Sequence, residues 1–216
     1  MPTVAIIGAS RGIGLELARQ YAADGWRVHA TTRRPESPGA LGEVPGDVVL
    51  HGLDVRDEAA VGALARALGD DALDVLVHNA GIKDGGHSRA EVMRVNAEAP
   101  IAVTEALMDA VARAGGRIVL VSSQLGARRG SRKSLGDYGD SKAALNDAVR
   151  ERAPRWAERG VTAIVIHPGW VRTDMGGSAA PVSVDESAHG IRSVISRLTP
   201  ADNGRFLTWR GDEHPW

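Results

Sequence analysis

The stretch Val4-Ala-Ile-Ile-Gly8-Ala-Ser-Arg-Gly12-Ile-Gly14 decides the fold. A short apolar run enters a glycine-rich turn, and a helical pattern of apolar residues follows until Asp24-Gly25. Glycines without side chains let a backbone approach a pyrophosphate, and the positive end of a helix dipole favours its negative charge. The stretch therefore predicts the first strand, turn and helix of a dinucleotide-binding fold, although a tight turn without a ligand would have the same glycines.

Strand-like and helix-like segments alternate along the rest of the chain. Strand patterns cover residues 27–32, 48–53, 73–78, 117–121, 161–166 and 204–209. Helical patterns follow Asp57, run over residues 89–114, begin near Tyr138 and run over residues 184–198. We therefore predict one α/β domain over residues 1–216, a Rossmann-type, doubly wound parallel sheet with helices on both faces.

The composition excludes several kinds of site. A chain of 216 residues that is 43% hydrophobic can bury a sizeable core, and a net charge of -1 gives no general attraction to nucleic acid. The absence of cysteine excludes disulfides, thiolate catalysis and cysteine-based zinc sites, and the seven histidines show no metal-site spacing. We expect no metal.

The chain also has no sequence typical of export or membrane insertion. Met1-Pro-Thr leads directly into an apolar strand without the charged start of a signal peptide, and no apolar run reaches the roughly 18 residues needed to span a bilayer. We expect a soluble, cytoplasmic protein. The basic segment 128–133 is the one hint of nucleic-acid binding; a solvated loop, or a loop that attracts an anionic substrate, is the alternative.

The end of the second predicted strand favours NADP over NAD. An NAD site wants a carboxylate here for the ribose 2′-hydroxyl, whereas NADP wants a cation for the 2′-phosphate. Arg33 and Arg34 stand at this position, and Arg11 in the glycine-rich turn adds a third positive charge. Ordinary loop arginines are the alternative.

Further polar and small residues follow other strands, and carboxyl ends of parallel strands meet at one edge of a sheet. These are Asp54-Val55, Asn79-Ala80-Gly81, Ser122-Ser123 and the segment from Pro168 to Thr173. Asp54 lies near the adenine or is a plain loop residue. Asn96 lies in a predicted helix whose other residues have a core-facing pattern. It is either a hydrogen-bonded buried amide or part of a proton relay.

Tyr138 and Lys142 are the candidate catalytic pair. Residues four apart lie on one face of a helix, and an ammonium beside a phenol lowers the phenol pKa from about 10. Such a phenol suits proton transfer near neutral pH, and Ser123 could hold the oxygen of a carbonyl substrate. A surface helix that happens to carry both residues is the alternative.

Together these motifs resemble the short-chain dehydrogenase/reductase family over essentially the whole chain. The segment 168–177 and the ending 204–216 resemble C-factor and sniffer-type carbonyl reductases within it. Three features depart from the family pattern: Ile7 replaces a common Thr, His78 replaces the first Asn of Asn-Asn-Ala-Gly, and the stretch from Gly81 to Asn96 is short.

The resemblance implies roles for these residues. Tyr138 is the general acid or base, Lys142 lowers its pKa and holds the nicotinamide ribose, Ser123 positions the carbonyl oxygen, and Asn96 supports a relay. Ser123 is favoured over Ser122 because Gly126 completes the family's Ser-x-x-Gly. The implied cofactor residues are Gly8, Ser10, Arg11, Gly12, Ile13, Gly14, Arg33, Arg34, Asp54, Val55, Asn79, Ala80, Gly81, Tyr138, Lys142, Pro168, Gly169, Val171 and Thr173.

We expect an NADPH-dependent reductase of aldehydes or ketones. Trp170 and Met175 are expected to wall a substrate pocket with Ser123, which favours an apolar carbonyl compound. The resemblance further implies a homodimer or homotetramer. A dinucleotide-binding signalling module with little catalysis is the alternative function, and the complete catalytic set argues against it.

Overall fold

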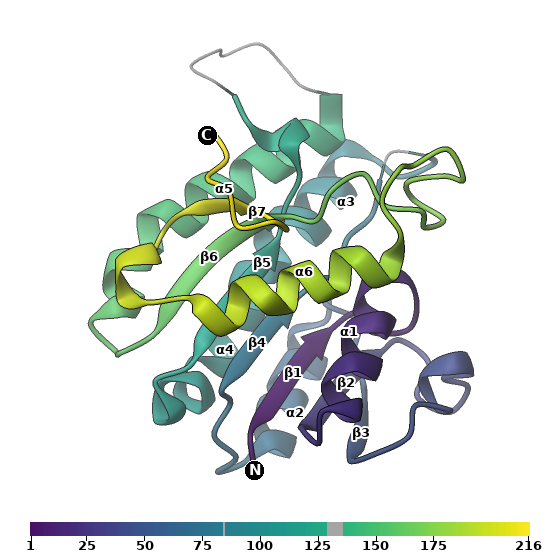
Figure 1. Ribbon diagram of the computed structural model, residues 1–216, viewed down its shortest axis with the longest axis vertical. Coiled ribbons are helices and arrows are strands. Elements are labelled where there is room, and N and C mark those ends of the chain that lie inside the picture. Colours follow the sequence, from purple (N-terminus) through teal and green to yellow (C-terminus); the bar gives the residue numbers. More distant parts are fainter. Residues whose placement is uncertain (84, 129–135) are drawn as a thin grey trace.

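Parallel strands form one seven-stranded sheet in the computed structural model, which describes residues 1–83, 85–128 and 136–216 (Figure 1). The order across the sheet is β3-β2-β1-β4-β5-β6-β7. The strands are β1 (Thr3–Ile7), β2 (Arg27–Thr32), β3 (Val48–Gly52), β4 (Val75–His78), β5 (Arg117–Val121), β6 (Thr162–His167) and β7 (Phe206–Thr208). The predicted Rossmann-type sheet is confirmed.

Strand β1 lies third in this order, between β2 and β4. All five of its residues are buried, as expected for an apolar strand covered on both faces. It pairs with β2 on one side and β4 on the other, so the chain builds the sheet outward in one direction and then in the other. This reversal is the place where open α/β sheets bind ligands.

Helices cover both faces of the sheet (Figure 1). Helices α1 (Gly12–Ala23) and α6 (Val184–Arg197) pack on one face, where Leu17 and Ile191 are fully buried. Helices α2 (Glu58–Leu68), α4 (Ala99–Ala114) and α5 (Gly136–Ala157) pack on the other face, over the side chains of Ile7 and Leu120. The short helical turns are η1 (Gly39–Leu41), η3 (Gln124–Gly126) and η4 (Pro200–Asp202).

The helical pattern predicted over residues 89–114 contains an irregularity that the sequence did not reveal. Helix α3 (Arg89–Met93) passes into five residues of π-helix, η2 (Arg94–Glu98), and then into α4. A π-bulge adds a residue to one turn and shifts the side chains that follow, and such bulges occur often at functional sites. Here the bulge carries Asn96.

The C-terminal tail runs back along β7. The Thr208 N–H donates to the Asp212 carbonyl and the His214 N–H to the Phe206 carbonyl, each at 2.8 Å. The rings of Phe206 and Trp216 lie 5.6 Å apart.

Within the described residues, no helix combines the length and apolar character that crossing a membrane requires.

Candidate active site

A cavity of about 660 Å³ lies at the carboxyl ends of the strands. Its walls come from the glycine-rich turn, the ends of β2 to β5, the start of α5 and the segment after β6. The cavity brings together sixteen of the predicted residues: Gly8, Ser10, Arg11, Gly12, Ile13, Arg33, Asp54, Val55, Asn79, Ala80, Gly81, Tyr138, Lys142, Pro168, Thr173 and Met175.

The other predicted residues are not among the described residues that line this cavity; they are Gly14, Arg34, Asn96, Ser123, Gly169, Trp170 and Val171. Val171 is buried and bridges to Val182. Trp170, expected as a pocket wall, is half exposed, and its indole N–H donates to the Gly176 carbonyl at 2.8 Å.

The glycine-rich turn is held between its neighbouring strands. The Gly8 N–H donates to Thr31 Oγ1, and the Asn79 side-chain amide donates to the Gly8 carbonyl, both at 2.8 Å. Gly8 has a φ of +83°, and a Cβ on it would lie 2.8 Å from the Cα of Ala80. A Cβ on Gly14 would lie 2.1 Å from the Gly8 carbonyl oxygen, so the close packing of α1 on β1 requires glycine there.

The N-terminus of α1 at this cavity suits an anion. Its N-cap residue is Arg11, and no described side chain caps the helix or places a carboxylate in its first turn. The first N–H groups of a helix lack partners within the helix and carry the positive end of its dipole. The turn and this helix end therefore fit the pyrophosphate of a dinucleotide.

The three arginines expected at the 2′-phosphate have different surroundings. Arg33 lines the cavity and forms no ion pair with a described residue, whereas Arg34 is not among the described lining residues. The Arg11 guanidinium pairs with the Asp174 carboxylate at 2.5 Å, and both side chains are about three-quarters exposed. Arg33 is therefore the cation best placed for a phosphate on the ribose.

Tyr138 and Lys142 both lie in the first turns of α5 and both line the cavity. The Lys142 ammonium lies 5.9 Å from the centre of the Tyr138 ring and donates to the Val121 carbonyl at 2.9 Å. Burial lowers the pKa of Lys142 to about 8. Gly126 lets η3 pack against this part of α5, because a Cβ there would lie 2.8 Å from the Lys142 carbonyl carbon.

The side chain of Asn96 is the hydrogen-bonded buried amide of the two alternatives. It donates to the Ile82 carbonyl at 2.7 Å and to Ser141 Oγ at 3.0 Å, and accepts from the Ile82 N–H at 2.9 Å. These bonds use three of the four that a side-chain amide commonly makes. Asn96 thus fixes the segment after Gly81 against α5, and the relay role stays an expectation.

The two serines after β5 have different partners. Ser122 lines the cavity, but its buried hydroxyl donates to the Asn146 side-chain carbonyl at 2.6 Å. The Ser123 hydroxyl accepts from the Leu125 N–H at 3.1 Å and so caps η3. A hydroxyl that accepts one hydrogen bond can still donate its own hydrogen.

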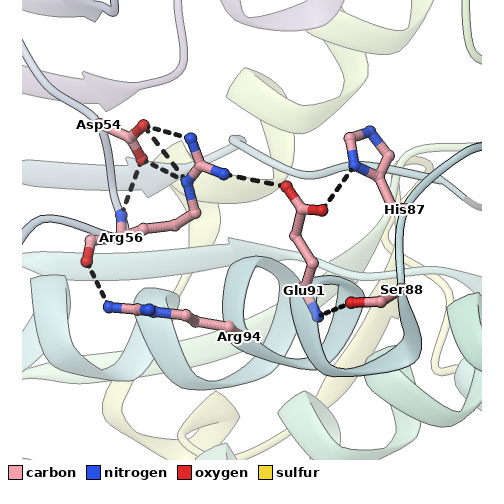
Figure 2. A network of polar contacts seen from close by, with 6 residues as sticks. All are labelled: Asp54, Arg56, His87, Ser88, Glu91 and Arg94. Carbon is pink, nitrogen blue, oxygen red and sulfur yellow. Dashed lines mark hydrogen bonds and ion pairs between the residues drawn. The ribbon is translucent and has the colours of Figure 1, made fainter.

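Figure 2 shows an ion-pair network around Asp54 that sequence reasoning missed, and its members Asp54, Arg56, His87 and Glu91 line the cavity. The Arg56 guanidinium bonds the carboxylates of Asp54 and Glu91, and Glu91 also pairs with His87 at 3.0 Å. The side-chain hydrogen bond from Arg56 lowers the pKa of Asp54 to about 2. Arg56 could have been suspected because it follows Asp54-Val55, but no local pattern brings Glu91 to it.

His78, the departure from Asn-Asn-Ala-Gly, is buried at the end of β4. Its Nε2 has no hydrogen-bond partner among the described residues. Burial and, secondarily, the charge of Lys142 lower its pKa to about 3, so this imidazole is neutral at physiological pH.

The basic segment 128–133 lies mostly outside the described residues, and Arg128 pairs with Asp147 at 2.7 Å.

The chain is similar in sequence to a known protein family and to known proteins. The sequence model of the family described as short chain dehydrogenase matches residues 2–182. The C-signal of Myxococcus xanthus is 36% identical over 155 residues, which cover 67% of this chain and 93% of that protein.

Solved structures of carbonyl reductases match over the full length of both chains, and two of them serve as examples. Carbonyl reductase Sniffer of D. melanogaster has a TM-score of 0.90 and 27% identity. A carbonyl reductase from Pseudomonas aeruginosa PAO1 in complex with NADP has a TM-score of 0.86 and 34% identity.

Proposed function

The chain belongs to the short-chain dehydrogenase family, and we propose that it is an NADPH-dependent reductase of aldehydes or ketones. One observation carries the proposal: Tyr138 and Lys142 face the same cavity as a glycine-rich turn and an uncapped helix N-terminus. This cavity therefore joins a proton-transfer pair to a site that fits a dinucleotide.

Each part of the cavity would hold a different part of the cofactor. The turn from Gly8 to Gly14 would hold the pyrophosphate and Arg33 the 2′-phosphate, with Arg11 and Arg34 nearby. Asp54 and Val55 would border the adenine. Asn79, Ala80 and Gly81, together with Pro168, Gly169, Val171 and Thr173, would flank the nicotinamide half. When bound, NADPH supplies the hydride for the carbonyl carbon.

The chain's own residues supply and position the proton. In the direction of reduction, Tyr138 donates its phenolic proton to the carbonyl oxygen as negative charge develops there. The Lys142 ammonium stabilises the phenolate that remains, since opposite charges close together in a buried site attract strongly. Ser123 donates a hydrogen bond to the same oxygen, and Asn96 would support a relay through water that returns a proton to Tyr138.

The preference for NADP rests on the charge at the end of β2. No carboxylate follows Thr31 and Thr32 there, and Arg33 lines the cavity. Support comes from the Pseudomonas aeruginosa carbonyl reductase, a relative in complex with NADP. NAD would lack a carboxylate partner for its ribose 2′-hydroxyl at this position.

The substrate would be a small carbonyl compound with an apolar group. Ile82, Val95, Met175 and Val184 line the cavity. The protein would act in the cytoplasm as a homodimer or homotetramer, without a membrane or nucleic acid as partner.

A signalling module with little catalysis is the second candidate, favoured by the likeness to the C-signal. A module that only binds a dinucleotide has no need of the Tyr138 hydroxyl. NADPH consumption that accelerates when any of a panel of aldehydes and ketones is added would decide for the reductase.

The first test is a fluorescence titration of the protein with NADPH and with NADH. We expect tighter NADPH binding, weakened by about tenfold in Arg33→Ala and less in Arg34→Ala, because only the former side chain faces the cavity. A preference for NADH would contradict the assignment at β2, and binding of neither nucleotide would remove the cofactor site and the reductase proposal with it.

A further inference from the structure

Arg56 bridges the carboxylates of Asp54 and Glu91 (Figure 2). All three residues line the cavity that Arg33 also lines, and the charge of Arg33 contributes to lowering the pKa of Asp54. The Nε and Nη2 of Arg56 donate to Asp54 at 3.0 and 2.6 Å, and its Nη1 donates to Glu91 at 2.9 Å. The bonds to Asp54 form a bidentate pair, the strongest geometry open to a guanidinium. The side chain is 39% exposed, so it belongs to the cavity wall rather than the core.

The two carboxylates are held in this wall by the backbone around them. Asp54 accepts from the Arg56 N–H at 3.0 Å, directly after β3. Glu91 stands in the first turn of α3, where the Ser88 hydroxyl accepts from its N–H at 3.2 Å and His87 Nδ1 lies 3.0 Å from its carboxylate. The backbone at a strand end and at a helix start thus places both carboxylates in the cavity wall.

Both groups are ionised at neutral pH. Hydrogen bonding from Arg56 holds the pKa of Asp54 at about 2, and hydrogen bonding from His87 lowers the pKa of Glu91. Without Arg56, the carboxylates of Asp54 and Glu91 would lose the guanidinium that bonds both of them, and Arg33 and His87 would remain as basic side chains beside them. A 2′-phosphate brings further negative charge to the same region, and like charges in a partly buried cleft repel.

We propose that Arg56 is a specificity-determining residue for dinucleotides that carry a 2′-phosphate, because it neutralises Asp54 and Glu91 beside Arg33. The inference rests on the proposed NADPH site and adds a residue outside the end of β2 to its nucleotide selection. The 2′-hydroxyl of NADH carries no charge, so Arg56 matters much less for binding NADH.

A merely structural brace makes a different prediction. If Arg56 only held the end of β3 against α3, removing it would loosen the part of the site that binds the adenosine of either nucleotide. The affinities for NADPH and for NADH would then fall equally. Arg205 offers a matched control, because it is also 39% exposed and also bonds two carboxylates, those of Asp202 and Glu213 at 2.7 and 2.6 Å. Arg205 is not among the described residues that line the cavity.

The test is isothermal calorimetry of NADPH and NADH binding to the full chain, in wild type, Arg56→Gln and Arg205→Gln. We expect Arg56→Gln to weaken NADPH binding about tenfold and NADH binding by about twofold or less, with the difference shrinking at high salt. Arg205→Gln should change neither. Equal weakening of both nucleotides by Arg56→Gln, or no weakening, would overturn the proposal.

Further variants keep the test decisive if Arg56→Gln folds poorly. Glu91→Gln should tighten NADPH binding about threefold and leave NADH binding unchanged, and Arg56→Lys should retain most of the NADPH affinity. Combining Arg56→Gln with Glu91→Gln should recover part of the loss. A Lys variant as weak as the Gln variant, or an unchanged NADPH affinity in Glu91→Gln, would refute the role of charge.

The outcomes also separate this inference from the proposed function. A wild-type protein that binds neither nucleotide would remove the cofactor site itself. A wild-type protein that binds NADPH tightly, with variants at Arg56 that lose NADPH and NADH equally, would refute the inference and leave the reductase proposal standing.

Discussion

Replacing Tyr138 by Phe removes one oxygen from the site and keeps the ring that lines the cavity. If the phenol is the proton donor, Tyr138→Phe lowers kcat for carbonyl reduction at least about 100-fold, the usual contribution of a positioned acid. NADPH affinity should stay within about twofold of wild type, because Lys142 and the glycine-rich turn are unchanged. Steady-state kinetics and a nucleotide titration measure both effects, and full turnover in the variant would remove Tyr138 from the mechanism.

The adjacent serines give a second prediction for single residues. Ser123→Ala should lower kcat/KM about 100-fold, because it removes a hydrogen bond that strengthens as the carbonyl oxygen gains charge. Ser122→Ala should leave kcat/KM within about threefold and lower the unfolding free energy by about 2 kcal/mol, because the buried Asn146 amide loses its 2.6 Å partner. The reverse pattern would move the catalytic role to Ser122, the serine that lines the cavity.

At the scale of elements, the contact between α1 and β1 depends on one glycine. A Cβ on Gly14 would lie 2.1 Å from the Gly8 carbonyl oxygen, so Gly14→Ala must push the helix away from the strand. We expect a loss of about 3 kcal/mol in unfolding free energy and weaker NADPH binding, since the helix N-terminus moves. Denaturant unfolding and a nucleotide titration are the measurements.

Gly62 is the control for this substitution. It also lies inside a helix, α2, but a Cβ there would meet only the flexible end of Arg66 at 3.4 Å. Gly62→Ala should therefore stabilise the protein by about 0.5 to 1 kcal/mol. Equal destabilisation by both alanines would show that the Gly14 contact relaxes easily.

The same elements show what the sequence could and could not predict. The glycine-rich turn, the apolar strands and the spacing of Tyr138 and Lys142 are local patterns, and the structure places them at one cavity as expected. The π-helical turn at Asn96 was not predicted, because one extra residue in a turn leaves the apolar period nearly unchanged. The contact of Arg56 with Glu91 joins residues 35 apart, and no short-range pattern encodes it.

At the scale of the whole molecule, buried histidines make stability depend on pH. Burial lowers the pKa of His78 to about 3 and that of His167 to about 4, from 6.5 in the unfolded chain. Between pH 6.5 and the folded pKa of each histidine, the unfolded chain binds more protons than the folded protein. The stability that these neutral imidazoles allow above pH 6.5 is therefore lost as the pH falls toward 4. Each imidazole contributes a slope of about 1.4 kcal/mol per pH unit in this range.

Denaturant unfolding at several pH values between neutrality and about pH 5 measures this slope. His78→Asn should reduce the slope by up to about 1.4 kcal/mol per pH unit at the acidic end of this range, because one protonation on unfolding disappears. An unchanged slope in His78→Asn would mean that this imidazole does not stay neutral in the folded protein.

The tail that runs back along β7 has a consequence for solubility. A sheet that ends in an open strand offers unpaired N–H and C=O groups to any strand of another molecule, which is a common start of aggregation. Here the Phe206 carbonyl and the Thr208 N–H are already bonded to residues 214 and 212. The last few residues thus seal the edge of the sheet, and a chain cut before Asp212 should self-associate as its concentration rises, which light scattering would detect.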